Sequence, residues 1–260
     1  MKKILQLIIF LFSIGISACD CDPPKITEKY IESDFVANVT IIKIYPNKKN
    51  EQGYKADIQI NELFKGERLK SIYIYGRSDN GFGTSCDIFI PINTKLIAYA
   101  RKNIDGNYGI GMCSGIMYLE YSRFFKKKTL KNKRELEKEN RELEILKTFQ
   151  DKNIKYTSKI RYSEKSKLHN DLEKFKGIKL DKNFGLYELN LSPDFKIKNI
   201  KLISGFENPI DKKLIDILSE TEWTSYKSGK EIKIPDNSKL LIGIYYYGNG
   251  NQSFLTQYYL

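Results

Sequence analysis

Four cysteines are the residues of this chain whose type and spacing could do chemistry. Cys19 and Cys21 are separated by a single residue and follow an apolar run, whereas Cys86 and Cys113 stand far down the chain. An acylated cysteine would anchor the chain to a membrane, a pair of cysteines would form a disulfide, and a cysteine at a new N-terminus could bind a metal through its α-amino group. The sequence leaves these three uses of Cys19 open.

The segment before Cys19 is typical of an export signal. Residues 1–3 form a basic head, and residues 4–16 are almost continuously apolar but too short to span a bilayer comfortably. This combination describes a secretory signal peptide that is removed from the mature protein. We therefore expect residues 1–18 to be cleaved and the protein to be exported, to the periplasm, to the outer membrane if it is lipidated, or out of the cell.

The residues at the cleavage point leave the fate of Cys19 undecided. Ile16-Ser17-Ala18-Cys19 resembles the lipobox of bacterial lipoproteins, in which an aliphatic residue and two small residues precede the acylated cysteine. Ordinary signal peptidase prefers a small residue at the position of Ile16, which favours lipidation. An even number of cysteines in an exported chain instead favours two disulfides, since lipidation of Cys19 would leave one cysteine without a partner.

The composition argues against catalysis and against a resident metal. The chain has one histidine, His169, so a typical zinc site or a histidine-activated nucleophile lacks its ligands. Gly81-Phe82-Gly83 lacks the later glycine of a dinucleotide-binding loop. We expect no enzyme activity, no cofactor and no bound metal. The net charge of +12 is compatible with nucleic acid, but an exported chain rarely meets it, and we expect no nucleic-acid partner.

Short strands separated by turn residues must position the cysteines. Alternating and β-branched apolar residues predict strands over Phe35–Ile44, Tyr54–Phe64, Ile72–Tyr75, Ile88–Ile90, Lys95–Ala100 and Tyr108–Met112. Several short strands of this kind predict a small closed barrel or a sandwich over residues 19–121.

The order of the cysteines along these strands resembles a known family. Five motifs carry the resemblance, namely Cys19-x-Cys21-x-Pro23, Phe64-Lys65-Gly66, Ser85-Cys86, Leu96-Ile97-Ala98-Tyr99 and Met112-Cys113-Ser114-Gly115. With them, residues 19–121 resemble the netrin-like fold, and within it the N-terminal domain of the tissue inhibitors of metalloproteinases and their bacterial relatives. The resemblance implies an OB-type barrel and two disulfides, Cys19–Cys86 and Cys21–Cys113, that clamp the N-terminal strand onto it.

The same resemblance implies a function for the N-terminus. In that family the α-amino and carbonyl groups of the first cysteine chelate the catalytic zinc of a metallopeptidase, and the second residue enters the specificity pocket. Cys19 and Asp20 hold these positions here. Catalytic zinc keeps an open position that a neutral amine can fill. The charge of Asp20 would be desolvated in an apolar pocket, which is unfavourable, and acylation of Cys19 would abolish chelation.

A charged helical connector is predicted over residues 122–155. Leu136, Leu143, Leu146 and Phe149 fall on one helical face, and opposite charges alternate around them. The heptads do not persist, which favours a single helix over a coiled coil.

Residues 156–260 predict a small α+β domain of order β-β-α-β. The expected helices cover Ser166–Lys176 and Ile210–Leu218, and the expected strands cover Phe184–Leu191, Phe195–Ser204, Lys230–Pro235 and Leu240–Tyr247. This order, with Trp223 and Gly229-Lys230-Glu231-Ile232, resembles the C-terminal domain of TonB-type energy transducers, although Ser225 stands where that family has proline. We expect Trp223 to lie in the core.

The chain is therefore interpreted as mainly β plus α+β, with a netrin-like barrel, a helical connector and a β-β-α-β domain. The leading hypothesis is an exported, non-catalytic protein-binding module of the bacterial cell envelope. One alternative is a metalloendopeptidase inhibitor that acts through Cys19, and another is an accessory protein of an outer-membrane or TonB-type assembly. The expected partner is a protein, either a zinc metallopeptidase or an envelope protein, and membrane contact is expected only through a lipid anchor at Cys19.

Overall fold

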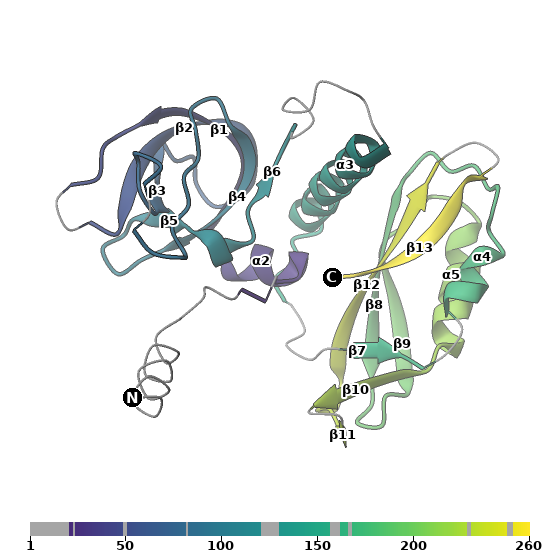
Figure 1. Cartoon of the computed structure of the whole chain (residues 1–260). Helices are drawn as coiled ribbons and strands as arrows, with labels where there is room; N and C mark the ends of the chain where they lie inside the picture. The colour runs from purple at the N-terminus through teal and green to yellow at the C-terminus, as the bar shows by residue number, and fades with distance from the viewer. Residues whose placement is uncertain are drawn as a thin grey trace, which may run out of the picture. The chain divides into compact units, whose positions relative to one another are not determined.

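A computed structural model describes residues 21–22, 24–48, 51–81, 83–120, 130–156, 162–165, 168–227, 230–248 and 252–260. The chain divides into two compact units (Figure 1). The barrel unit holds Ser33–Leu119 and the described residues before Pro24, and the sheet unit holds Pro24–Glu32 and Glu120–Leu260.

The barrel unit is a closed, mixed barrel of five strands (Figure 1). Its strands are β1 (Phe35–Ile44), β2 (Gly53–Lys65), β3 (Ser71–Tyr75), β4 (Lys95–Lys102) and β5 (Tyr108–Ile110). Neighbours follow the order β1-β2-β3-β5-β4, and β4 pairs again with β1 to close the barrel. The β3–β5 pair is parallel and the other pairs in the ring are antiparallel. A short strand, β6 (Met117–Tyr118), pairs with the other end of β4.

Alternate residues of the strands fill the barrel. On β1, Phe35, Ala37, Val39 and Ile41 belong to one buried cluster, because successive side chains of a strand point to opposite faces. The cluster continues with residues of the other strands, among them Ala56, Ile72, Ile74, Leu96, Ala98 and Ile110. The alternation read from the sequence therefore identified the barrel interior.

Five of the six predicted barrel strands are found, although the one predicted over Tyr108–Met112 ends at Ile110. Residues 88–90 are not a strand. The backbone N–H of Ile88 is donated to the carbonyl of Tyr75, and that of Ile90 is donated to the hydroxyl of Tyr54. Ile90 is fully buried, so its apolar character reflects anchoring of a loop in the core and not a place in the sheet.

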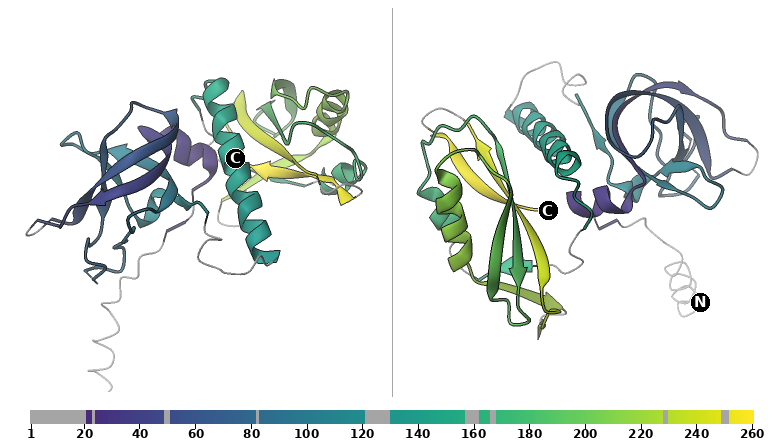
Figure 2. Two further views of the ribbon diagram at one scale, coloured as in Figure 1. Left: turned by 90° about the horizontal axis from the view of Figure 1, so that it is seen from above. Right: turned by 180° about the vertical axis from the view of Figure 1, so that it is seen from behind.

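The sheet unit is built on a four-stranded antiparallel sheet in the order β13-β12-β8-β9. These strands are β8 (Phe184–Leu191), β9 (Ile197–Ser204), β12 (Ser238–Tyr247) and β13 (Phe254–Tyr259), and a second, three-stranded sheet is made of β7 (Tyr162–Glu164), β10 (Trp223–Lys227) and β11 (Lys230–Glu231). The helices are α2 (Ile26–Glu32), α3 (Leu130–Asp151), α4 (Leu168–Glu173) and α5 (Ile210–Glu220). Helices α4 and α5 lie on one face of the four-stranded sheet and α3 lies on the other (Figure 2).

The predicted β-β-α-β order is found as β8, β9, α5 and β12, with β12 in place of the strand predicted over Leu240–Tyr247. The bounds of β8 agree with the prediction, and β8 and β9 form the expected antiparallel hairpin. The strand predicted over Lys230–Pro235 is wrong beyond Glu231. In that stretch the N–H of Ile234 is donated to the carbonyl of Pro193, which lies in the β8–β9 turn. Strands β7, β10 and β13 were not predicted.

Helix α3 groups with the sheet unit, although the sequence suggested a connector between domains. Its inward side carries Ile145, Leu146 and Phe149, all fully buried. Leu136 was predicted for the same apolar face but is 42% exposed. The short helix α2 joins the same unit, because the ring of Tyr30 packs edge-on against Phe149 with centroids 5.4 Å apart.

A buried ion pair also joins α2 to α3. The ammonium of Lys29 lies 2.6 Å from a carboxylate oxygen of Glu142, and the two side chains are only 8% and 5% exposed. The partners are 113 residues apart in the chain. Burial desolvates both charges, so the ionised form of each side chain is stabilised by the opposite charge of the other.

Trp223 lies in the main core of the sheet unit, as predicted. It is 3% exposed and belongs to the same buried cluster as Leu214 and Leu218 of α5 and Ile242 of β12. Its indole N–H is buried without a hydrogen-bond partner in the described part of the chain. The residue therefore contributes apolar volume and not a polar contact.

Two substitutions of Trp223 should separate the contribution of its apolar volume from that of its unpaired N–H. Trp223→Ala should lower the free energy of unfolding of the sheet unit by about 3–5 kcal/mol, because it leaves a large cavity. Trp223→Phe should cost about 1.5 kcal/mol or less, because it keeps most of the apolar volume and removes an unpaired N–H. Denaturant unfolding of both variants measures the difference, and equal losses would contradict the packing role.

Candidate functional site: the disulfide edge of the barrel

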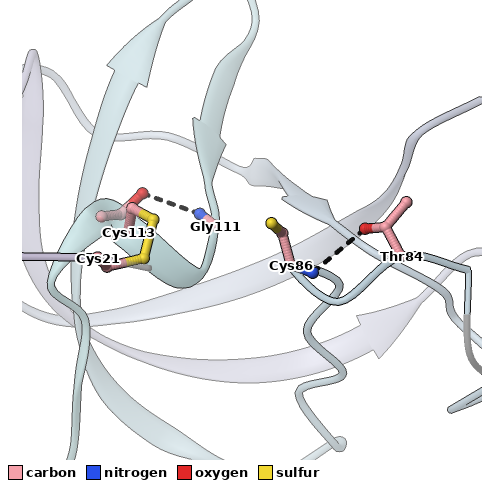
Figure 3. Close-up of a disulfide and its surroundings, with 6 residues drawn as sticks. Cys21, Thr84, Cys86, Gly111 and Cys113 are labelled. Carbon is pink, nitrogen blue, oxygen red and sulfur yellow. Dashed lines mark hydrogen bonds between the residues drawn. A yellow bond between two sulfur atoms is a disulfide. The ribbon is translucent and has the colours of Figure 1, made fainter. Parts of the chain in front are cut away.

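Cys21 is bonded to Cys113, which confirms one of the two predicted disulfides. The two Cα atoms are 5.4 Å apart, and the bond joins positions separated by 92 residues (Figure 3). It ties the start of the described chain to the short 3-10 helix η1 (Met112–Ser114), which follows β5. We use the name disulfide edge for Cys21, Cys86, Cys113, Tyr75 and Met112.

Cys86 is also disulfide-bonded, and it is exposed. Its backbone N–H is donated to the hydroxyl of Thr84 at 3.3 Å (Figure 3). Its predicted partner, Cys19, and the neighbouring Asp20 lie outside the described residues. The Cys19–Cys86 bond, lipidation of Cys19, zinc chelation by Cys19 and the specificity contact of Asp20 therefore stay predictions.

A closed turn holds Cys113 at the surface. The N–H of Gly111 is donated to the hydroxyl of Ser114 at 2.8 Å, and the N–H of Ser114 is donated to the carbonyl of Gly111 at 3.0 Å. Gly115 ends η1 with a φ of +70°, in the left-handed region that favours glycine. The motif Met112-Cys113-Ser114-Gly115 thus has a local structural reason for its residue types.

Tyr75 lies across the backbone of β5 beside this turn. A Cβ atom on Gly109 would come within 2.9 Å of the tyrosine ring, and one on Gly111 within 3.3 Å. The two glycines therefore let the ring rest on the strand. Tyr75 remains 44% exposed and Met112 is 46% exposed. They give the disulfide edge an apolar surface that the cysteine pattern alone did not reveal, because no sequence signal marks an exposed tyrosine.

A pocket of about 470 Å³ adjoins the edge. Its lining includes Glu51, Tyr75, Arg77, Thr84, Cys86 and Asp87. The pocket thus combines one aromatic ring and one disulfide-bonded cysteine with charges of both signs. The pocket therefore offers both polar and apolar contacts.

Ion pairs and hydrogen bonds fix the loop that forms the pocket. The guanidinium of Arg77 lies 2.6 Å from a carboxylate oxygen of Asp79. Hydrogen bonds from this guanidinium and from the N–H of Gly81 lower the pKa of Asp79 to about 2. Thr84 donates its hydroxyl to Asp87 at 2.6 Å. Arg77 and Asp79 are therefore both charged throughout the physiological pH range.

Metal-ligating side chains do not gather at the disulfide edge among the described residues. In the described part of the chain, no three histidine, cysteine, aspartate or glutamate side chains come together as metal ligands. His169 is exposed on α4, 3.9 Å from Glu173, and takes part in no such group. No helix among the described residues is long and apolar enough to cross a membrane.

Comparison of the chain with models of known protein families and with curated protein sequences finds no match. The disulfide, the exposed side chains beside it and the neighbouring pocket therefore carry the functional argument.

Proposed function

We propose that this protein is an exported, non-catalytic protein-binding module of the cell envelope that contacts its partner through the disulfide edge. The observation that carries the proposal is the Cys21–Cys113 bond, which fixes Cys21 to η1, the turn that holds the exposed Met112 and lies beside the exposed ring of Tyr75. Exposed aromatic and methionine side chains are enriched at protein interfaces. A rigid barrel and a covalent staple limit the entropy lost on binding.

In this proposal the barrel is of the OB type and netrin-like. The strand order β1-β2-β3-β5-β4, its closure onto β1 and its parallel β3–β5 pair support that assignment. The pairing of Cys21 with Cys113 agrees with the connectivity that the family resemblance implies. An accessory role in an outer-membrane or TonB-type assembly stays a prediction.

Loss of the exposed apolar surface should abolish partner binding. The variant Tyr75→Glu should fail to retain an envelope protein that the wild type retains, because a carboxylate replaces the aromatic contact. Ile104→Glu is the matched control, since Ile104 is fully exposed on the β4–β5 turn of the same barrel. Affinity isolation from a solubilised envelope fraction measures retention, and equal retention by both variants would contradict the assignment of the binding surface.

Inhibition of a zinc metallopeptidase is the second candidate function, and the position of Cys21 favours it. The Cys21–Cys113 bond fixes a residue two places after Cys19 to the barrel, as chelation by a rigid N-terminus requires. In this mechanism the neutral α-amine of Cys19 donates its lone pair to the open position of the zinc. The amine must be free, so acylation of Cys19 and inhibition exclude each other.

One residue added before Cys19 should test whether the α-amine of Cys19 is responsible for inhibition. Placing one alanine before Cys19 converts the amine into a planar amide, which does not bind zinc, so any inhibition should disappear. Asp20→Ser should strengthen inhibition, because it removes a charge that the pocket would desolvate. The assay is hydrolysis by a panel of metallopeptidases. If the wild type and both variants are equally inactive, the inhibitor function is rejected and the binding module stands.

A further inference from the structure

The sheet unit contains a pocket of about 280 Å³ between α3 and the C-terminal end of β12. On α3 it is lined by Glu137, Asn140 and Glu144, and on the side of the sheet by Asn183, Tyr245 and Tyr247. All of these residues belong to one compact unit. We refer to it as the tyrosine–carboxylate pocket.

The charge of this pocket is opposite to that of the chain. The net charge of the protein is +12, yet the described lining includes two carboxylates and neither lysine nor arginine. The amides of Asn140 and Asn183 add carbonyl acceptors. A lining of this kind repels anions and offers its acceptors to a donor that carries positive charge.

Tyrosine rings form one wall of the pocket. Tyr247 packs edge-on against Tyr245 with centroids 5.0 Å apart, and it stacks on Phe254 at 4.9 Å. From outside the lining, Arg141 donates a hydrogen bond to the hydroxyl of Tyr247, and its guanidinium lies 4.5 Å from the ring centroid of Tyr258. The aromatic cluster therefore already accepts one cation from the protein itself.

The carboxylates occupy two different environments. Glu144 is partly buried and accepts hydrogen bonds from the hydroxyl of Tyr245, at 3.3 Å, and from Asn183. Burial raises the pKa of Glu144, although the hydrogen bonds from Tyr245 and Asn183 and the positive charge of Lys147 favour its ionised form. Glu137 and Asn140 lie two turns and one turn before Glu144 on α3. Both carboxylates of the pocket therefore come from α3, and Asn183 lies on the side of the sheet.

We propose that the tyrosine–carboxylate pocket binds a protonated primary amine on an aliphatic stem. The ammonium N–H groups donate to Glu144, and the stem packs on Tyr245 and Tyr247. A metal ion fits less well, because no cluster of three metal-ligating side chains exists in the described part of the chain. A quaternary ammonium would leave the acceptors without donors.

A free diamine and the lysine side chain of a partner present this same chemistry. The site lies in the sheet unit and does not depend on the disulfide edge. A failed test of amine binding would therefore leave the proposed function unaffected, and the reverse also holds. Binding of a cation beside Glu144 favours its ionised form, and this links amine binding to the release of a proton near the pH at which Glu144 titrates.

Calorimetric titration of the full-length protein tests the proposal. The probes are cadaverine, as a free diamine, and Nα-acetyl-lysine methylamide, as a lysine side chain, with tetramethylammonium as the comparison. We expect saturable binding of at least one primary amine and weaker binding of tetramethylammonium. Glu144→Gln should weaken amine binding about tenfold, the loss expected for one hydrogen bond to a charged group.

Glu220→Gln is the charge-matched control, because Glu220 is exposed at the end of α5, and it should leave binding unchanged. Tighter binding of cadaverine would identify a free amine as the ligand, and tighter binding of the lysine derivative would identify a partner's side chain. The proposal is overturned if neither amine binds, if Glu144→Gln binds as the wild type does, or if tetramethylammonium binds equally well. Thermal unfolding of Glu144→Gln confirms that the variant is folded.

Discussion

Glu142→Gln is expected to destabilise the sheet unit by about 3–5 kcal/mol, because it removes the carboxylate that lies 2.6 Å from the buried ammonium of Lys29. The side chains of Lys29 and Glu142 are 8% and 5% exposed, so water cannot take the place of the lost carboxylate. Denaturant unfolding followed by circular dichroism measures the loss. The same substitution should loosen α2, which Lys29 holds against α3.

Two further variants make this prediction specific. Glu135→Gln breaks the exposed Lys138–Glu135 pair on the same helix, whose side chains are 52% and 40% exposed, and it should change stability by about 0.5 kcal/mol or less. The double variant Lys29→Met with Glu142→Leu removes both charges and should recover most of the stability lost by Glu142→Gln. If Glu135→Gln costs as much as Glu142→Gln, burial is not the cause.

Cys113→Ser should destabilise the barrel unit by about 4–5 kcal/mol. The Cys21–Cys113 bond joins positions 92 residues apart, and in the chain-entropy model a loop of this size gives a stabilisation of that order. Cys21→Ser should cost the same amount, because either change removes the same bond. The double variant should cost no more than either single one. Additive losses in denaturant unfolding would show that the two cysteines act separately.

The sequence predicted those parts of the fold that depend on local pattern. Strand β1 follows from the alternation over Phe35–Ile44, and β8 follows from the apolar run over Phe184–Leu191. Residues 88–90 were misassigned because a buried loop anchor and a strand have the same apolar composition. The placement of α2 depends on Lys29 and Tyr30 meeting residues of α3 that are far away in the chain, and no local pattern contains that information.

The sequence predicted only part of the candidate site. The cysteine order and the family resemblance gave the Cys21–Cys113 pair, which the structure shows. The exposed ring of Tyr75 could not be inferred, because its position depends on its packing against Gly109 of β5 and Gly111, which follows that strand. The tyrosine–carboxylate pocket likewise arises only when α3 lies on the sheet, and its residues come from three separate segments.

Site-specific photo-crosslinking tests the central claim, that the disulfide edge binds a protein, most directly. A benzophenone amino acid is placed at Met112, beside the disulfide, or at Ile104, which is fully exposed on the same barrel. We predict an adduct with one envelope protein from position 112, none from position 104, and loss of the adduct when excess unlabelled wild type competes. An adduct from position 104 of equal yield, or none from position 112 while the envelope protein is still retained, would contradict the assignment of the disulfide edge as the binding surface.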